Sequence, residues 1–126
     1  MQRYIAAAPG PILAKFAMMN ASEFCIVYVP VPDEDSGLRI ARAAVENRLC
    51  ACANLFPSGT SVYEWQGKIC VESERILMLK TRTDLYPHLS QKIRELHPYS
   101  VPAMLKLSVA EVNDDYARWM RQVLNP

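Results

Sequence analysis

The stretch that decides the fold is Ser61-Val-Tyr-Glu-Trp-Gln-Gly-Lys-Ile69, between Ala51-Cys-Ala-Asn-Leu-Phe-Pro57 and Arg75-Ile-Leu-Met-Leu-Lys-Thr-Arg82. Apolar and aromatic residues recur in it with a period of two, and Gln66-Gly67 supplies a turn whose glycine can adopt a positive φ. These features predict a long β-hairpin. The residues expected to share one face of it are Tyr63, Trp65, Ile69 and Val71. Because a long ribbon is marginal alone, the pattern also predicts an assembly of subunits.

The composition of the chain fits one domain without a strongly charged partner. It has 126 residues, of which 51% are hydrophobic and 21% charged, which is enough to bury one core. The net charge is +1, from 14 basic and 13 acidic residues, so no strong field attracts nucleic acid or an anionic membrane. No segment approaches the length of a membrane span. We therefore expect neither nucleic acid nor a membrane as a partner.

The first 22 residues differ from the rest. They hold two basic residues and no acidic ones, and Pro9, Gly10 and Pro11 interrupt their apolar character, which argues against a secretory signal. We predict a flexible tail over residues 1–22 and a folded domain over residues 23–126. A cytoplasmic location is expected, and an organelle transit peptide in the acid-poor tail is the alternative.

The four cysteines fit either a core or a metal site. Cys25 lies in an apolar run, where a thiol behaves as a small hydrophobic side chain, and the chain has no Cys-x-x-Cys motif. Cys50 and Cys52 are two residues apart, so on a strand their thiols would face the same side and could bind a soft metal. The core interpretation is the simpler one, with a reducing compartment as the default.

The rest of the chain alternates between strand and helix patterns. The apolar, β-branched run 24–31 predicts a central strand buried on both faces. Acidic residues at 33–35 precede a helical stripe that ends near Leu49. After the hairpin, Thr83 or Asp84 is expected to cap a second helix with Pro87 in its first turn.

The last third of the chain predicts a fourth strand and a final helix. Alternation over 101–109 indicates a strand with one buried face. Asn113-Asp114 can cap an amphipathic helix, whose expected buried stripe is Tyr116, Trp119, Met120, Val123 and Leu124. The resulting order, βαββαβ plus a helix, predicts an α+β, ferredoxin-like sandwich with both main helices on one sheet face. The helix that carries Trp119, or neighbouring subunits, must cover the other face.

Four motifs in sequence order carry a family resemblance. They are AAVENRLCACAN at 43–54, SVYEWQGKI at 61–69, KTR at 80–82 and LHPYSVP at 96–102. Together they resemble the CutA family, named for divalent-cation tolerance, over about residues 24–124. The resemblance implies a homotrimer in which long hairpins pair between neighbours. It also implies a non-enzymatic role in copper or metal-ion binding and in the response to metal.

The resemblance also implies positions for metal ligands. Copper-binding members are thought to use a cysteine in the first strand and a histidine pair after the second helix. These positions fall on Val29, Leu96 and His97, and only His97 can coordinate a metal. Together with Cys50 and Cys52, His97 completes the set of expected ligands for copper or another divalent ion.

A second group of residues is expected at a cleft or interface between subunits. Its members are Asn54, Tyr63, Trp65, Lys80, Arg82 and Tyr99. An alternative function follows from this group: a signalling module that binds a small anionic, nucleotide-like ligand, with Lys80, Arg82 and His97 as donors. No spacing suggests a hydrolytic triad, a Gly-rich phosphate loop or paired catalytic carboxylates, so an enzyme is not expected.

Overall fold

The computed structural model describes residues 10–11 and 22–124, so the expected tail lies almost wholly outside the described residues. The elements of the domain are, in chain order, β1 (Phe24–Val31), α2 (Glu34–Glu46), β2 (Cys52–Trp65), β3 (Lys68–Arg82), a 3-10 turn (Thr83–Leu85), α3 (Tyr86–Leu96), β4 (Leu105–Ser108) and α4 (Asp114–Leu124). This order confirms the predicted α+β arrangement. In the described part of the chain, no helix combines the length and apolarity needed to cross a membrane.

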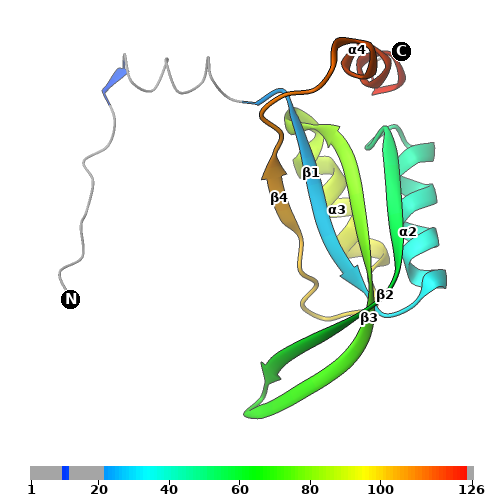
Figure 1. Cartoon of the computed structure of the whole chain (residues 1–126), viewed down its shortest axis with the longest axis vertical. Helices are drawn as coiled ribbons and strands as arrows, with labels where there is room; N and C mark the ends of the chain where they lie inside the picture. The colour runs from blue at the N-terminus through cyan, green and yellow to red at the C-terminus, as the bar shows by residue number, and fades with distance from the viewer. Residues whose placement is uncertain (1–9, 12–21, 125–126) are drawn as a thin grey trace.

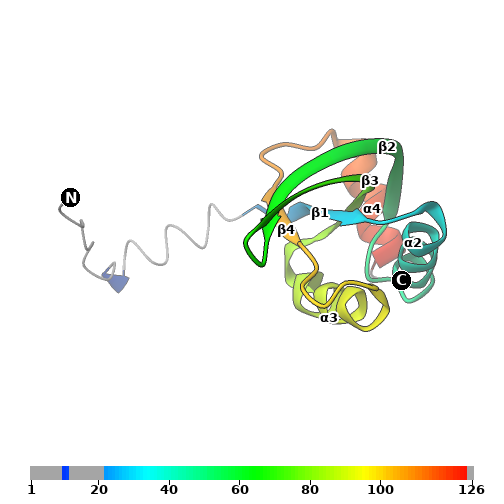
Figure 2. The same cartoon turned by 90° about the horizontal axis from the view of Figure 1, so that it is seen from below.

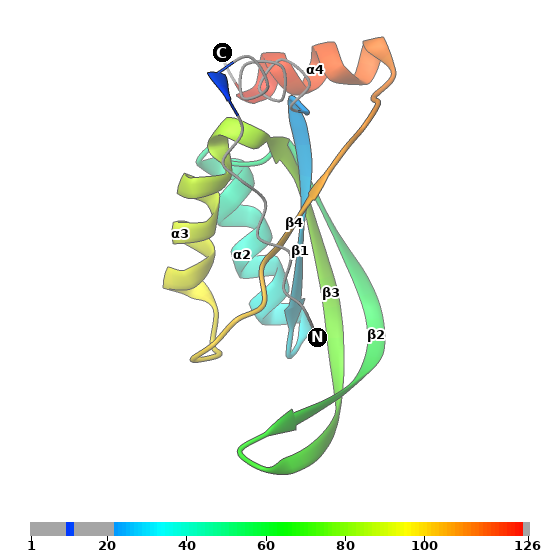
Figure 3. The same cartoon turned by 90° about the vertical axis from the view of Figure 1, so that its left-hand side faces the viewer.

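The strands form one antiparallel sheet in the order β2-β3-β1-β4, with β1 in the interior as expected (Figure 1). Helices α2 and α3 pack on the same side of this sheet (Figure 2). The β2–β3 hairpin is longer than its neighbours and extends beyond the sheet, while α4 lies across the opposite end (Figure 3). The hairpin therefore leaves the body of the domain as a two-stranded ribbon.

The core lies between the sheet and these two helices. Alternate residues of β1 enter it, and Val27, Val29 and Val31 are completely buried, whereas Ile26 and Tyr28 on the other face are half-buried. The prediction that β1 is buried on both faces was therefore wrong for the single chain, because only one face carries helices. The remaining buried members of the core are Cys25, Ile40, Ala44, Cys50, Leu77, Leu79, Leu89 and Ile93.

The hairpin turn forms as predicted, but the residues that share each face of the hairpin differ from those expected. Gln66 and Gly67 both have positive φ, 50° and 80°, as a tight two-residue hairpin turn requires. Trp65 then pairs with Lys68 and Tyr63 with Cys70. Directly paired residues share a face, so the expectation that Ile69 and Val71 lie beside Tyr63 and Trp65 was wrong. Ile69 and Val71 share the opposite face with Val62 and Glu64.

Strand β2 continues through Pro57. The pairing shifts between Phe56 and Gly59, where β2 takes three steps while β3 takes two. This bulge accommodates a proline, which has no N–H to donate to the ladder. It also separates the register of β2 residues 52–56 from that of residues 59–65 in the ribbon.

Two other local expectations fail. The N-cap of α3 is Leu85 without a side-chain hydrogen bond, because the Asp84 carboxylate pairs with Arg82 and the Thr83 hydroxyl donates to the Ser22 carbonyl. Strand β4 is short, and its apolar residues Leu105 and Leu107 are 54% and 48% exposed rather than buried. Both leucines pair with β1 residues on the sheet face that has no helices.

Helix α4 covers only one end of that face. Its buried residues are Ala117, Met120 and Leu124, which pack with Phe24 and Ala51. Trp119 was expected in the buried stripe but is 41% exposed, because Ala117 takes the inward position instead. The rest of the helix-free sheet face has no cover within the described chain.

We expect Leu79→Ala to lower the free energy of unfolding by about 2–5 kcal/mol, because the substitution leaves a cavity in a fully buried site. Leu38→Ala is the matched control, since Leu38 is 44% exposed on α2 and its loss costs at most about 1 kcal/mol. Urea denaturation at one fixed chain concentration measures both. Equal losses would contradict the assignment of the core.

Candidate functional site

Where the hairpin leaves the sheet, it forms a pocket with the loop that follows α3. The pocket has a volume of about 450 Å³ and is called the hairpin pocket below. Its lining residues are Tyr63, Trp65, Cys70, Glu72, Pro98, Tyr99, Ser100 and Val101. Three of the residues expected at a cleft, Tyr63, Trp65 and Tyr99, are therefore brought together by the fold.

Two tyrosine–carboxylate hydrogen bonds organise the hairpin pocket. The Tyr99 hydroxyl donates to Glu74 over 2.7 Å, which joins the loop to β3, and the Tyr63 hydroxyl donates to Glu72 over 2.8 Å across the hairpin. The bond to the Glu72 carboxylate raises the pKa of Tyr63 to about 12. Burial, followed by the bond to Glu74, raises the pKa of Tyr99 well above its ordinary value. Both hydroxyls therefore act as donors at neutral pH.

His97 does not line the hairpin pocket but packs against Tyr99, which does. One ring nitrogen, Nε2, lies 2.8 Å from the Pro30 carbonyl, and the other, Nδ1, accepts from the Tyr99 backbone N–H at 3.1 Å. A carbonyl can only accept, so the proton resides on Nε2. His97 is 7% exposed and its ring stacks at a tilt on Tyr99, with 4.8 Å between centroids. It ties the end of β1 to the loop.

The three expected metal ligands do not converge in this chain. Cys50 lies before β2 in the buried core, where burial raises the pKa of its thiol to about 12. Cys52 begins β2 and pairs with Lys80. The neighbours of Lys80 along β3, Leu79 and Thr81, are completely buried on the helix side of the sheet. Lys80 and its partner Cys52 therefore belong to the helix-free face. The expectation that both thiols face the same side is therefore wrong.

His97 adds no third donor to either thiol, since both its ring nitrogens already have partners. Within the described residues, no group of three or more His, Cys, Asp or Glu side chains could hold a metal ion. The family's other copper positions carry packing side chains, because Val29 is fully buried and Leu96 packs against the core. These residues do not fit a resident copper site as they stand.

The expected anion donors are also separated. Lys80 lies with its ammonium 5.5 Å from the centre of the Tyr116 ring, and Arg82 pairs with Asp84 at 3.0 Å. Both are near the α4 end of the sheet, whereas His97 binds the opposite end of β1. Asn54 is exposed on β2 and pairs with Met78, away from the hairpin pocket. Within residues 22–124, the three donors therefore lie apart.

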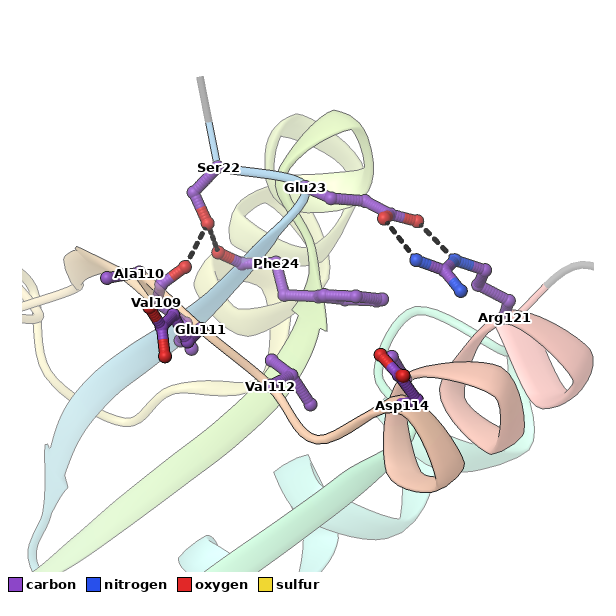
Figure 4. A pocket seen from close by; sticks show the side chains of 10 residues that line it. Ser22, Glu23, Phe24, Val109, Ala110, Glu111, Val112, Asp114 and Arg121 are labelled. Atoms are coloured by element: carbon purple, nitrogen blue, oxygen red, sulfur yellow. Dashed lines mark hydrogen bonds and ion pairs between the residues drawn. The ribbon is translucent and has the colours of Figure 1, made fainter. Parts of the chain in front are cut away.

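A second cavity, of about 660 Å³, lies at the α4 end (Figure 4). Arg121 makes a two-pronged ion pair with Glu23, both bonds 2.7 Å long, and its guanidinium lies 5.5 Å from the centre of the Phe24 ring. The hydrogen bond to Arg121 lowers the pKa of Glu23. These contacts attach the start of β1 to α4, and they leave the guanidinium already paired.

Sequence reasoning missed two acidic residues at the hairpin pocket: Glu72, which lines it, and Glu74, which bonds to Tyr99 of its wall. Glu72 and Glu74 follow Cys70 at intervals of two on β3, so all three share a face. Counting residues outward from the two-residue turn pairs Cys70 with Tyr63, so Tyr63 and Trp65 lie on the same face as Cys70 and Glu72. That count was available in the sequence once the turn had been fixed.

Comparisons with known proteins give the family. A sequence model described as "CutA1 divalent ion tolerance protein" matches residues 25–123, which is most of the chain. The chain belongs to this family. It is 42% identical over 97 residues to the "Divalent-cation tolerance protein CutA" of Thermus thermophilus, covering 77% of this chain and 94% of that protein.

Human "Protein CutA" is 47% identical over 96 residues, which cover 76% of this chain, but the chain spans only 54% of the human protein. Among solved structures, CutA1 from Ehrlichia chaffeensis superposes with a TM-score of 0.79 at 33% identity and covers 83% of this chain and 98% of that one. The four-stranded α+β fold is therefore the fold of CutA1 family structures.

We expect the Tyr63 hydroxyl to titrate near pH 12, against an ordinary value of 10.0, because ionisation would place its charge beside Glu72. The folded-state pKa is raised, so the stabilisation is complete below pH 10 and is lost as the pH rises through 12. Ring ¹³C NMR, assigned with Tyr63→Phe, measures this, and Glu72→Gln should return the pKa toward its ordinary value. An unchanged pKa in Glu72→Gln would refute the assigned cause.

Proposed function

We propose that this chain acts in divalent-cation tolerance, as a non-enzymatic homotrimer that responds to copper or another divalent metal ion. The observation that carries the proposal is membership of the CutA1 family over residues 25–123. Relatives that the match covers over most of their length, such as the Thermus thermophilus protein, are named as tolerance proteins rather than as enzymes. The relatives' name, divalent-cation tolerance protein, is thus the basis for the activity proposed here.

The uncovered apolar surface supports assembly into a trimer. Large apolar side chains on the ribbon and on β4 are about half to nearly three-quarters exposed. These residues are Val62 at 66%, Ile69 at 72%, Val71 at 65%, Leu105 at 54% and Leu107 at 48%. A water-soluble chain rarely leaves so many apolar side chains exposed on neighbouring strands, and further copies would cover them. The two-stranded ribbon gains partners by the same association.

The proposed ligands for the ion are His97, Cys50 and Cys52. Because they do not converge within one chain, a site made from them has to be assembled by the ion or by association of subunits. We also propose that residues 1–22 form a tail outside the domain of residues 23–126 and that the cytoplasm is the compartment of the protein. Organelle targeting is the alternative, since an Arabidopsis thaliana relative is named chloroplastic.

Growth of a bacterial host that lacks its own CutA relative tests the proposed function. We expect expression of this chain to raise the copper concentration that halves the growth rate, with no effect on tolerance of sodium chloride. Cys50→Ser/Cys52→Ser and His97→Ala variants show whether these residues carry the effect, since a variant without the site behaves like the empty vector. Equal sensitivity with and without the wild-type chain, tested with copper, zinc and cobalt salts, would disprove the proposal.

We expect Trp65→Ala to dissociate or strongly weaken the trimer, because a large aromatic residue at an interface commonly contributes about 2–4 kcal/mol. Trp119→Ala is the matched control, since Trp119 is similarly exposed but lies on α4 beside Tyr116. Light scattering after size-exclusion chromatography, over a dilution series, gives the mass. A monomeric wild type, or two variants of identical mass at every dilution, would rule out the assigned interface.

A further inference from the structure

The hairpin pocket combines negative charge with aromatic side chains and has no cation of its own. Glu72 and Glu74 each accept one hydrogen bond from a tyrosine hydroxyl. Neither carboxylate takes part in any ion pair among the described residues. Glu74 is 7% exposed, which is unusual for a carboxylate without a cationic partner.

The nearby cations are engaged elsewhere or lie apart. Arg75 follows Glu74 in the sequence but points to the other side of β3 and is paired with Glu34. Lys68 sits opposite Trp65 at the turn and forms no ion pair with Glu72 or Glu74 in the described chain. The hairpin pocket therefore retains the Glu72 carboxylate, whose remaining lone pairs can accept further hydrogen bonds, while the buried Glu74 bonds to Tyr99 of the pocket wall.

The aromatic residues define the rest of the ligand. Tyr63, Trp65 and Tyr99 line the pocket together with Val101, so the wall is apolar apart from its acidic side. Faces of tryptophan and tyrosine attract cations, and carboxylates bind ammonium groups through charge-assisted hydrogen bonds. A volume of about 450 Å³ is within the usual range for small-molecule sites.

We propose that the hairpin pocket binds a small organic ammonium compound, with the ammonium group donating to Glu72 and an apolar body against Trp65 and Tyr63. A metal ion is the weaker alternative, since no group of three metal-ligating side chains occurs in the described residues. The negative charge of Glu72 in the pocket wall disfavours an anion. This site is separate from the cysteines and from the cation-tolerance role proposed above.

The test uses the assembled protein with all 126 residues of this sequence in a Trp119→Phe background, which leaves Trp65 as the single tryptophan. The probe is 2-phenylethylammonium at pH 7.5, and the comparison compounds are neutral 2-phenylethanol and anionic phenylacetate. We expect the ammonium compound to change Trp65 fluorescence saturably, with calorimetry giving the same dissociation constant. The neutral and anionic compounds should bind at least about tenfold more weakly, since they lack the charge-assisted bonds.

Glu72→Gln should weaken binding of the ammonium probe about tenfold or more, because it removes the exposed carboxylate of the pocket. Glu64→Gln is the matched control: the same substitution on the same hairpin, opposite Ile69 on the other face. Light scattering and the melting temperature confirm that both variants keep the assembly and fold of the parent. The absence of saturable binding, equal binding of the three compounds, or equal affinities of the two variants would each overturn the proposal.

Discussion

The antiparallel pairing of β2 with β3 is the interaction on which the rest of this structure depends. It runs from Cys52 paired with Lys80 to Trp65 paired with Lys68, well past the point where β1 ends opposite Arg75. Beyond that point the two strands have only each other and the loop after α3. A two-stranded ribbon is marginally stable in water, so the chain must support it from elsewhere. The Tyr99–Glu74 bond supplies one support, and association of subunits would supply the larger one.

The same pairing creates the hairpin pocket. The turn at Gln66-Gly67 and the bulge between Phe56 and Gly59 together set which side chains share a face. The turn sets the register of the ribbon, and the bulge lets residues 52–56 of β2 keep a different register with β3 in the body of the sheet. His97 then fixes the loop that closes the pocket, because its two ring nitrogens join Pro30 and Tyr99. A residue expected to be a metal ligand thus has a positioning role in the single chain.

In this member of the CutA1 family, the side chains at the expected ligand positions belong to the core, and polar groups suited to binding lie at the hairpin pocket. Val29 and Leu96, the two positions at which the family resemblance suggested copper ligands, contribute to the core instead. Cys50 is likewise a core residue whose thiol stays protonated. Glu74, in contrast, is a carboxylate at a position that is only 7% exposed, and Glu72 on the same face lines the hairpin pocket. They are therefore the stronger indication of a binding site within one chain.

The sequence by itself determined the elements, the turn and the family, because hydrophobic period, Gly67 and the ordered motifs are local features. Strand β1 was predicted to the residue. The sequence did not determine which faces are covered: β1 and β4 were expected to be buried where the single chain leaves them open. Nor did it bring Glu74 to Tyr99 or separate Cys50 from Cys52. Burial and side-chain proximity depend on packing between segments distant in sequence, and one added residue in a strand reverses every face beyond it. Only the tertiary structure could decide them.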